Sequence, residues 1–204
     1  MGQRPSLRAT VTAATLTRPR LGRAARRATI IDGAARVFAR SGFAATTMAD
    51  ITDAVGVSHL IVYRHFDSKE ALYISILDQA IEDLREALRA PGSIGPYGPT
   101  PGALLAGARR HPDAFRVLWR HAPREREFAH HGERANRLVT GPTREALAPI
   151  VPDDALTWAS RATVTYVIQA VLGWVEAGDS RQDARFSTAT TAALRAGVRS
   201  WSAP

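Results

Sequence analysis

Residues 47–66 read TMADITDAVGVSHLIVYRHF, and this stretch decides the fold. It predicts a short helix that begins after Thr47, because Asp50 stands three residues later in a Thr-x-x-Asp variant of the capping box. Gly56 breaks this helix, and Ser58 is placed to cap a second short helix that runs to the end of the stretch. Two short helices joined by a tight glycine turn are typical of a helix-turn-helix.

Hydrophobic periodicity predicts helices on both sides of this stretch, so the chain is expected to be all-α. The expected helices cover residues 24–41 (with Gly42 as the stop), 69–89, 103–110, 112–121, 124–147, 153–178 and 182–200. Pro142 should end or kink the helix over 124–147. Residues 91–102 hold four prolines and four glycines, which exclude helix and central strand and predict a loop.

These patterns divide the chain into five segments. They are a basic arm with little order (1–22), a three-helix helix-turn-helix domain (23–68), a long connecting fourth helix (69–89), a Pro/Gly loop (90–102) and a C-terminal helical domain (103–204).

Charge is concentrated at the start of the chain. Of a formal net charge of +8, residues 1–69 contribute most, with ten arginines and one lysine against four aspartates. A basic segment that leads into a small helical domain favours nucleic acid as the partner. This segment is expected to reach an adjacent minor groove through Arg18, Arg20, Arg23, Arg26 and Arg27; the alternative is that it only screens charge without specific contacts.

Composition excludes several classes of protein. The chain has no cysteine, which rules out disulfide scaffolds, cysteine nucleophiles and thiolate metal sites. No apolar run approaches 18 residues, so no membrane span is expected. The start of the chain matches a short myristoylation pattern, and its acid-free, arginine-rich character is similar to a transit peptide, but both signals are short and degenerate.

The sequence resembles the TetR family of bacterial transcription regulators. The residues that carry the resemblance are GFAATTMADITDAVGVS (42–58), VYRHF (62–66) and SKEAL (68–72). The resemblance covers about residues 23–77, and the later half matches only in helical character and length. It implies a cytoplasmic homodimer, most often a repressor, that binds a palindromic double-stranded DNA operator. It implies no cofactor, no metal and no enzymatic activity.

The resemblance also implies roles for single residues. Thr47 would anchor a phosphate, Ser58 would cap the recognition helix, and Lys69 would contact a phosphate. His59 and Leu60 would lie near base edges, Tyr63 and His65 would contact backbone or base, and Arg64 would contact a phosphate or a guanine. Phe66 is expected in the core, and Tyr63 and His65 have core or structural alternatives.

Leu60 and Ile61 depart from the family pattern, in which a glycine or small residue is commonly followed by threonine or serine. These side chains cannot donate to a phosphate. One of them could pack on a thymine methyl group, the apolar feature of the major groove; extra core packing is the alternative.

The resemblance places an effector-binding and dimerisation function in the C-terminal domain. The resemblance implies that the last two helices form the dimer interface, and these helices are also the most apolar, as expected of helices buried from two sides. Candidate residues for the ligand site are Phe115, Trp119, His121, Phe128, His131, Asn136, Tyr166, Gln169 and Trp174. Aromatic residues at helical spacing are also typical of core, so this set is the least specific of the predictions.

Two other functions remain open at this point. Glu127, His130, His131 and Glu133 have carboxylate–histidine spacing that could bind a metal in an enzyme, although the segment reads more simply as a solvated face. The other alternative is a constitutive DNA-binding dimer with no small-molecule effector.

Overall fold

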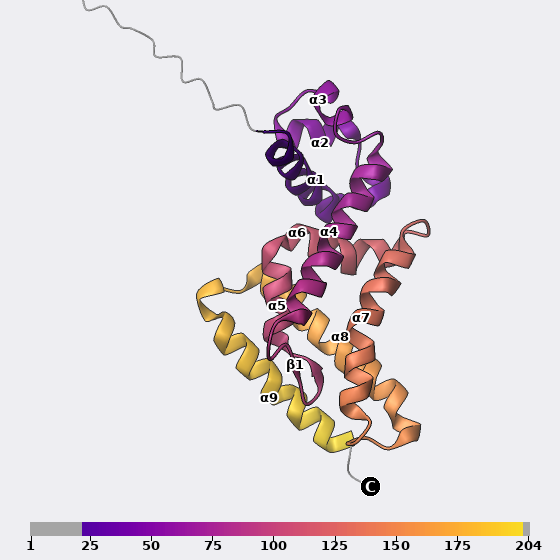
Figure 1. Ribbon diagram of the computed structural model, residues 1–204, viewed down its shortest axis with the longest axis vertical. Coiled ribbons are helices and arrows are strands. Elements are labelled where there is room, and N and C mark those ends of the chain that lie inside the picture. The colour runs from indigo at the N-terminus through magenta and orange to yellow at the C-terminus, as the bar shows by residue number, and fades with distance from the viewer. Residues whose placement is uncertain (1–21, 202–204) are drawn as a thin grey trace, which may run out of the picture.

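The computed structural model describes residues 22–201 and is built almost entirely of helices (Figure 1). The N-terminal half consists of α1 (Arg23–Ala45), α2 (Met48–Val55) and α3 (His59–Tyr63), and α4 (Lys69–Arg89) leads from it into the C-terminal half. That half contains β1 (Ile94–Gly95), β2 (Gly98–Pro99), α5 (Pro101–Arg110), α6 (Pro112–Arg116), the π-helical η1 (Val117–His121), the 3-10 turn η2 (Ala122–Arg124), α7 (Ala129–Leu147), α8 (Asp153–Ala177), the 3-10 turn η3 (Ser180–Gln182) and α9 (Asp183–Trp201). The all-α prediction is confirmed, and the basic arm before Gly22 lies outside the described residues.

Helix α1 ends in the way the sequence predicts. Its buried face includes Ile30, Ala34 and Phe38, which recur every four residues and face the core. Gly42 has φ of +74°, a left-handed conformation that glycine adopts without a steric penalty, and it interrupts the helical geometry before Ala45.

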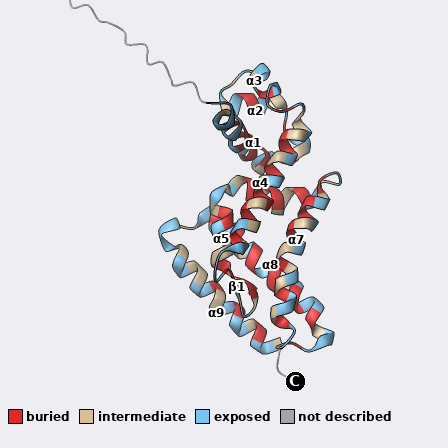
Figure 2. Cartoon of the chain, viewed as in Figure 1, coloured by how far each residue is buried: buried red, intermediate tan, exposed pale blue. Residues whose placement is uncertain are grey.

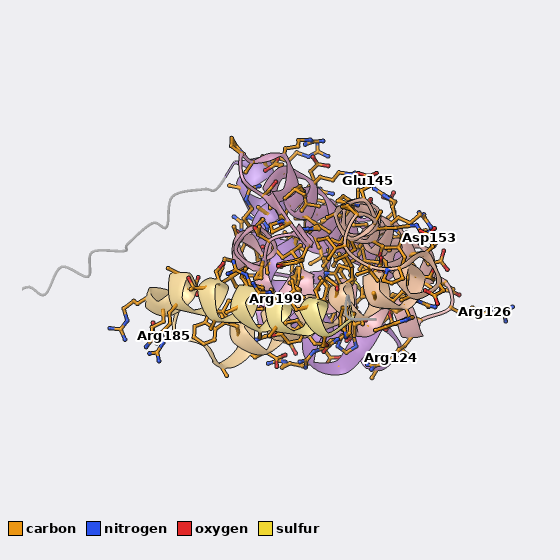
Figure 3. The ribbon with its side chains drawn as sticks, turned by 90° about the horizontal axis from the view of Figure 1, so that it is seen from below. Arg124, Arg126, Glu145, Asp153, Arg185 and Arg199 are labelled. Carbon is orange, nitrogen blue, oxygen red and sulfur yellow. The ribbon has the colours of Figure 1, made fainter. Side chains whose placement is uncertain are left out.

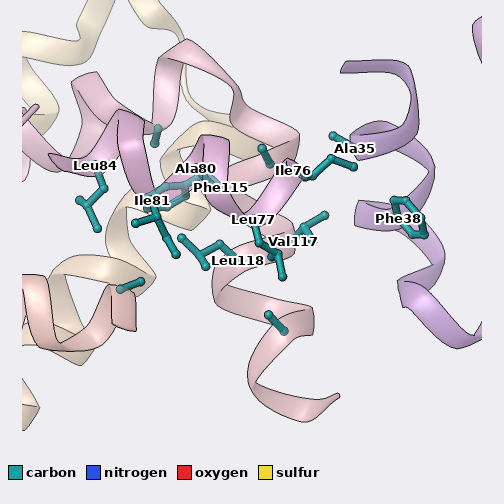
Figure 4. Packing of buried hydrophobic residues seen from close by; sticks show 14 of the residues in the cluster. Ala35, Phe38, Ile76, Leu77, Ala80, Ile81, Leu84, Phe115, Val117 and Leu118 are labelled. Atoms are coloured by element: carbon teal, nitrogen blue, oxygen red, sulfur yellow. The ribbon is translucent and has the colours of Figure 1, made fainter. Parts of the chain in front are cut away.

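Helix α4 is the spine that joins the two halves. Ile76 packs toward α1, while Leu77 and Ile81 pack against Phe115 and Leu118 of the C-terminal half (Figure 4). Buried positions continue along α4 through the junction, as Figure 2 shows. One hydrophobic cluster therefore extends through both halves. Because such a core is close-packed, a displacement of one half requires the packing of the other half to adjust.

The Pro/Gly stretch departs from its prediction. Residues 94–99 form a small antiparallel hairpin in which Ile94 pairs with Pro99, and α5 already begins at Pro101. Gly98 has φ of +98°, and a Cβ there would lie 2.6 Å from the Cα of Thr143. The loop prediction is therefore wrong for this part of the stretch. The hairpin is stabilised by packing against α7, a contact between distant segments that the local sequence pattern does not reveal.

Two helix predictions in the C-terminal half also need correction. The helix expected over 112–121 is split into α6 and the π-helical η1, and the helix expected from 124 begins only at Ala129. Pro142 does not end α7, which continues to Leu147. None of the helices within residues 22–201 is long and apolar enough to cross a bilayer.

Helices α8 and α9 flank the C-terminal half. One face of α8 carries Val164, Val167, Val171 and Val175, all buried in the main core. A second, smaller cluster joins Leu147, Leu156 and Val198 at the far end of the half. Seen from below in Figure 3, Arg126 and Arg185 extend from the periphery of this half into solvent.

Candidate nucleic-acid interface

The start of α2 carries the predicted capping box. The Thr47 hydroxyl accepts a hydrogen bond from the Asp50 N–H (3.2 Å), and the Asp50 carboxylate accepts one from the Thr47 N–H (2.8 Å). The same carboxylate also accepts from the Thr47 hydroxyl (2.7 Å). These bonds lower the pKa of Asp50, with the Thr47 hydroxyl as the largest cause. Gly56 ends α2 in the left-handed conformation (φ +71°), so the predicted turn is confirmed.

Helix α3 has a buried face and an exposed face. Val62 and Phe66, four residues apart, are buried and fix the helix to the domain, so the core prediction for Phe66 is confirmed. On the other side Leu60 is 62% exposed and Tyr63 48% exposed, two of the few large hydrophobic side chains that the described surface presents. Their exposure leaves them available to a partner surface.

The neighbours of these residues differ in their roles. His59 and Arg64 are exposed, and the His59 ring lies near that of Tyr63, with centroids 6.4 Å apart. Ile61 is half-buried and packs against the core, which agrees with the alternative prediction of extra core packing. Leu60 is exposed and does not pack against the core.

Ser58 occupies the N-cap position of α3 but does not cap it with its side chain. Its backbone is extended, as at other N-caps, yet its hydroxyl makes no capping hydrogen bond. The capping prediction is therefore wrong for the side chain, because α3 has only a short run of residues (His59–Tyr63) and its first turn is held by backbone bonds to the Ser58 carbonyl.

Arg23 and Arg26 of α1 lie beside the recognition helix. Together with Ile61, Arg64 and His65 they line a hollow of about 470 Å³. None of these three arginines forms an ion pair with any residue in 22–201, whereas many arginines of the C-terminal half do, such as Arg109 with Asp183 (2.8 Å). Unpaired guanidinium groups around a hollow form a strong site for phosphate oxygens.

Arg27 and Lys69 are engaged in contacts inside the domain. The Arg27 guanidinium donates to the Ser75 hydroxyl (3.1 Å) and lies 4.8 Å from the centre of the Phe66 ring. The Lys69 ammonium donates to the carbonyls of Phe43 (3.0 Å) and Thr46 (2.8 Å). The Lys69 ammonium also lies 4.2 Å from the centre of the Phe43 ring, so both residues hold α1 against α4.

The predicted ligand residues do not converge. Phe115 and Phe128 are buried core residues; Trp119 is half-buried; Tyr166 and Gln169 are exposed. His121 lies against the Ala39 carbonyl (3.1 Å), Trp174 donates to Asp183 (2.7 Å), and Asn136 is exposed. None of the hollows described for residues 22–201 is lined by more than one of them. Helical spacing alone does not tell which side of a helix faces a cavity.

Sequence reasoning missed a small apolar cavity of about 10 Å³ between β2, α5, α7 and α8. Leu104, Val139 and Val167 line it, and the Thr163 hydroxyl in its wall is buried with no hydrogen-bond partner. A valine-rich stretch interrupted by threonines was the only signal for it.

The carboxylate–histidine spacing of 127–133 does not form a metal site. Glu127, His130 and Glu133 are exposed, and His131 is buried beneath them. Burial lowers the pKa of His131, and the adjacent His130 lowers it further. Within the described residues no group of three histidines or carboxylates is arranged to hold a metal ion.

Comparison with known proteins places the N-terminal domain in a family. Residues 30–76 match the family described as "Bacterial regulatory proteins, tetR family". The chain is 44% identical over 63 residues to the transcriptional repressor KstR2 of Rhodococcus jostii, and the matched stretch is 31% of each chain. It is 39% identical over 74 residues to the transcriptional activator FasR of Mycolicibacterium smegmatis, a stretch that covers 34% of each chain. The match thus spans about a third of the length of these relatives.

Solved structures share the fold over much more of the chain. A TetR-like transcriptional regulator from Rhodococcus sp. RHA1 superposes with a TM-score of 0.68 at 19% identity, covering 88% of this chain and 98% of the other. A transcriptional regulator from Aquifex aeolicus gives a TM-score of 0.62 at 16% identity, covering 84% and 98%. These four relatives are all described as transcription regulators, in keeping with the expectation that the chain is not an enzyme. The N-terminal domain is therefore similar in sequence to bacterial regulatory proteins of the tetR family, and the helical architecture of the chain has the fold of the solved TetR-like regulator.

Proposed function

We propose that the chain is a homodimeric, sequence-specific DNA-binding transcriptional regulator, most simply a repressor, acting in the bacterial cytoplasm where its operator lies. The observation that carries the proposal is the exposed face of α3, where Leu60 and Tyr63 stand beside the unpaired Arg64. Side chains at the start of a recognition helix read base edges in the major groove, and basic groups around it hold phosphates.

The predicted contact residues other than Arg27 and Ile61 have DNA-binding roles in this proposal. His59 and Leu60 face base edges, Tyr63, Arg64 and His65 contact base or backbone, and Arg23 and Arg26 hold flanking phosphates. Thr47 and Ser58, at the starts of α2 and α3, and Lys69 are the remaining candidates for phosphate contacts. Ile61 serves packing rather than readout.

Selection of bound duplexes from a random pool tests the proposal directly. We expect a palindrome whose half-sites are separated by about one helical turn, 34–36 Å, or a multiple of it, because each subunit of a dimer places one α3 in the groove. Recovery of no enriched sequence at modest ionic strength would contradict sequence-specific binding. A non-palindromic motif would contradict the dimer.

The outward face of α8 and α9 is the proposed dimer interface. Trp158 is 48% exposed and Tyr166 41% exposed, and Ala193 and Gly197 line a predominantly apolar groove of about 290 Å³ beside Tyr166. An exposed apolar face of this kind is typical of an interface that a second copy of the chain covers.

We expect Ala193→Glu to convert the dimer to a monomer, because an unpaired carboxylate would be buried at the interface. Sedimentation equilibrium would measure the change. Ala90→Glu, at an exposed position after α4 and outside the groove, is the matched control and should remain dimeric. An Ala193→Glu protein that stays dimeric would place the interface elsewhere.

A small hydrophobic or aromatic effector is the second part of the proposal. The partnerless Thr163 hydroxyl in an apolar wall is the observation that favours it, since buried polar groups are nearly always satisfied. The cavity of about 10 Å³ is the size of one water, so a ligand would have to open it. A thermal-shift screen of hydrophobic compounds separates this form from a constitutive dimer, because a ligand of the folded state raises its stability.

A further inference from the structure

Glu125 links the two halves of the molecule at one point. It follows η2 in the C-terminal half, and its Oε1 accepts a hydrogen bond from the backbone N–H of Phe43 (2.7 Å), 82 residues earlier in the chain. Its other oxygen accepts a hydrogen bond from the hydroxyl of Tyr73 on α4. A single carboxylate of the C-terminal half therefore holds both the end of α1 and the spine helix.

The segment that Glu125 holds is the α1–α2 turn, residues 42–46. Lys69 of α4 donates hydrogen bonds to the carbonyls of Phe43 and Thr46. The turn is therefore bonded both to Lys69 of α4 and to Glu125 of the C-terminal half. His121 also lies against it: a Cβ on Gly42 would come within 3.2 Å of the His121 ring and 3.4 Å of the Glu125 carboxylate. The approach of the segment 121–125 to the turn is therefore close.

The surroundings of Glu125 make its bonds strong. The rings of Phe43, Tyr73 and Phe128 pack together, with centroids 4.7–5.1 Å apart, so the carboxylate is half-buried beside apolar groups. Burial and the hydrogen bond to Glu125 raise the pKa of Tyr73, so its hydroxyl keeps its proton and remains a donor. Hydrogen bonds to a charged group in such surroundings are stronger than those between neutral groups.

The α1–α2 turn is connected to the recognition helix α3 through α2. It leads directly into Thr47 and the capping box that starts α2, and α2 packs on α1 and braces α3. A shift of the turn is therefore a shift of α2 and, with it, of the exposed face of α3. Segment 121–125 begins at the last residue of the π-helical η1, an irregular geometry that is frequent at functional sites.

We propose that Glu125 is a positioning residue for DNA binding. It fixes the α1–α2 turn from the C-terminal half, by a route separate from α4. A movement of η1 and η2 that withdraws Glu125 from the turn loosens the position of the recognition helix α3. The proposal rests on the proposed DNA-binding function. It assigns to the C-terminal half a direct hold on the helix-turn-helix domain in addition to the shared spine.

Amide hydrogen exchange on the full chain tests the contact itself. In Glu125→Ala we expect the amides of the α1–α2 turn to exchange about ten to a hundred times faster, while those of α8 keep their wild-type rates. Glu125→Gln should retain most of the protection, because its amide can accept from Phe43 and donate to the Tyr73 oxygen. Glu127→Ala, an exposed glutamate two residues away, is the matched control and should exchange as wild type.

DNA binding to the selected operator tests the positioning role. We expect Glu125→Ala to weaken binding about tenfold or more and to accept a wider range of half-site spacings, with Glu125→Gln close to wild type. Unchanged turn exchange, or faster exchange with unchanged affinity and spacing, would overturn the proposal. If Glu125→Ala speeds amide exchange throughout the chain, the substitution has destabilised the whole fold. Tyr73→Phe is then tested instead, because it removes the hydrogen bond from Tyr73 to Glu125 and keeps the aromatic ring. The same changes in exchange at the turn and in DNA binding are expected of it.

The two readouts keep this proposal apart from the function on which it rests. If the wild-type chain selects no duplex, the proposed function fails, and the exchange experiment still reveals whether Glu125 holds the turn. If the wild type selects an operator and the Glu125 variants behave as Glu127→Ala does, only the positioning role fails.

Discussion

Replacing Phe66 with alanine is expected to lower the free energy of unfolding by about 3–5 kcal/mol. The Phe66 side chain is 4% exposed and packs in the core that Val62 and Ile51 complete, so its removal leaves a cavity under the recognition helix. Arg27 would also lose the ring over which its guanidinium lies. Because a domain is stable by only about 5–15 kcal/mol, this loss is a large part of the total.

Urea denaturation followed by circular dichroism measures the loss, and Tyr63→Ala is the matched control. Tyr63 is an aromatic residue three positions earlier, but it is 48% exposed, so its replacement should change stability by less than about 0.5 kcal/mol. Tyr63→Ala should instead weaken DNA binding. Equal destabilisation by the two substitutions would contradict the division of α3 into a core face and a reading face.

The features of the site that could be predicted from sequence are those whose partners are close in the chain. Thr47 and Asp50 are three residues apart, and Gly56 needs only its own backbone to turn, so the capping box and the turn are both predictable. The alternation of buried Val62 and Phe66 with exposed Leu60 and Tyr63 follows from the helical period.

The features that could not be predicted depend on contacts between distant segments. Lys69 resembles a phosphate-binding residue in its motif, but its donors reach carbonyls 23 and 26 residues earlier. Glu125 stands in a run of arginines and glutamates that reads as a solvated face, and only the fold brings it to Phe43. The hairpin over 94–99 likewise exists because α7 packs against it.

The arginines near the N-terminus show the same limit within one helix. Arg26 and Arg27 are adjacent, but successive residues of a helix point about 100° apart. Arg26 therefore lines the hollow with Arg64, while Arg27 faces α4 and contacts Ser75. Arginine abundance predicted an anionic partner for the whole segment, whereas among the described arginines it is Arg23, Arg26 and Arg64 that line the hollow beside α3.

Removing these three charges together should change the salt dependence of DNA binding more than any other surface substitution. Each phosphate contact contributes about 0.9 to the slope of log affinity against log salt concentration, because it releases condensed counterions. If Arg23, Arg26 and Arg64 each hold one phosphate, the variant with alanine at all three should have a slope shallower by about 2.7 and much weaker binding at low salt. Filter binding or fluorescence anisotropy over a salt series measures both quantities.

The matched control removes three arginines from the opposite half. Arg126, Arg144 and Arg185 are exposed and form no ion pair with a described residue, so their replacement changes the net charge by the same amount. Long-range attraction depends on net charge and is screened beyond about 10 Å at 0.1 M salt, whereas a phosphate contact is local. A slope change confined to the first variant locates the contacts in the hollow beside α3. Equal slope changes in both variants would mean that the arginines of that hollow act only through general electrostatic attraction. An unchanged slope in both variants would mean that these arginines do not contact DNA.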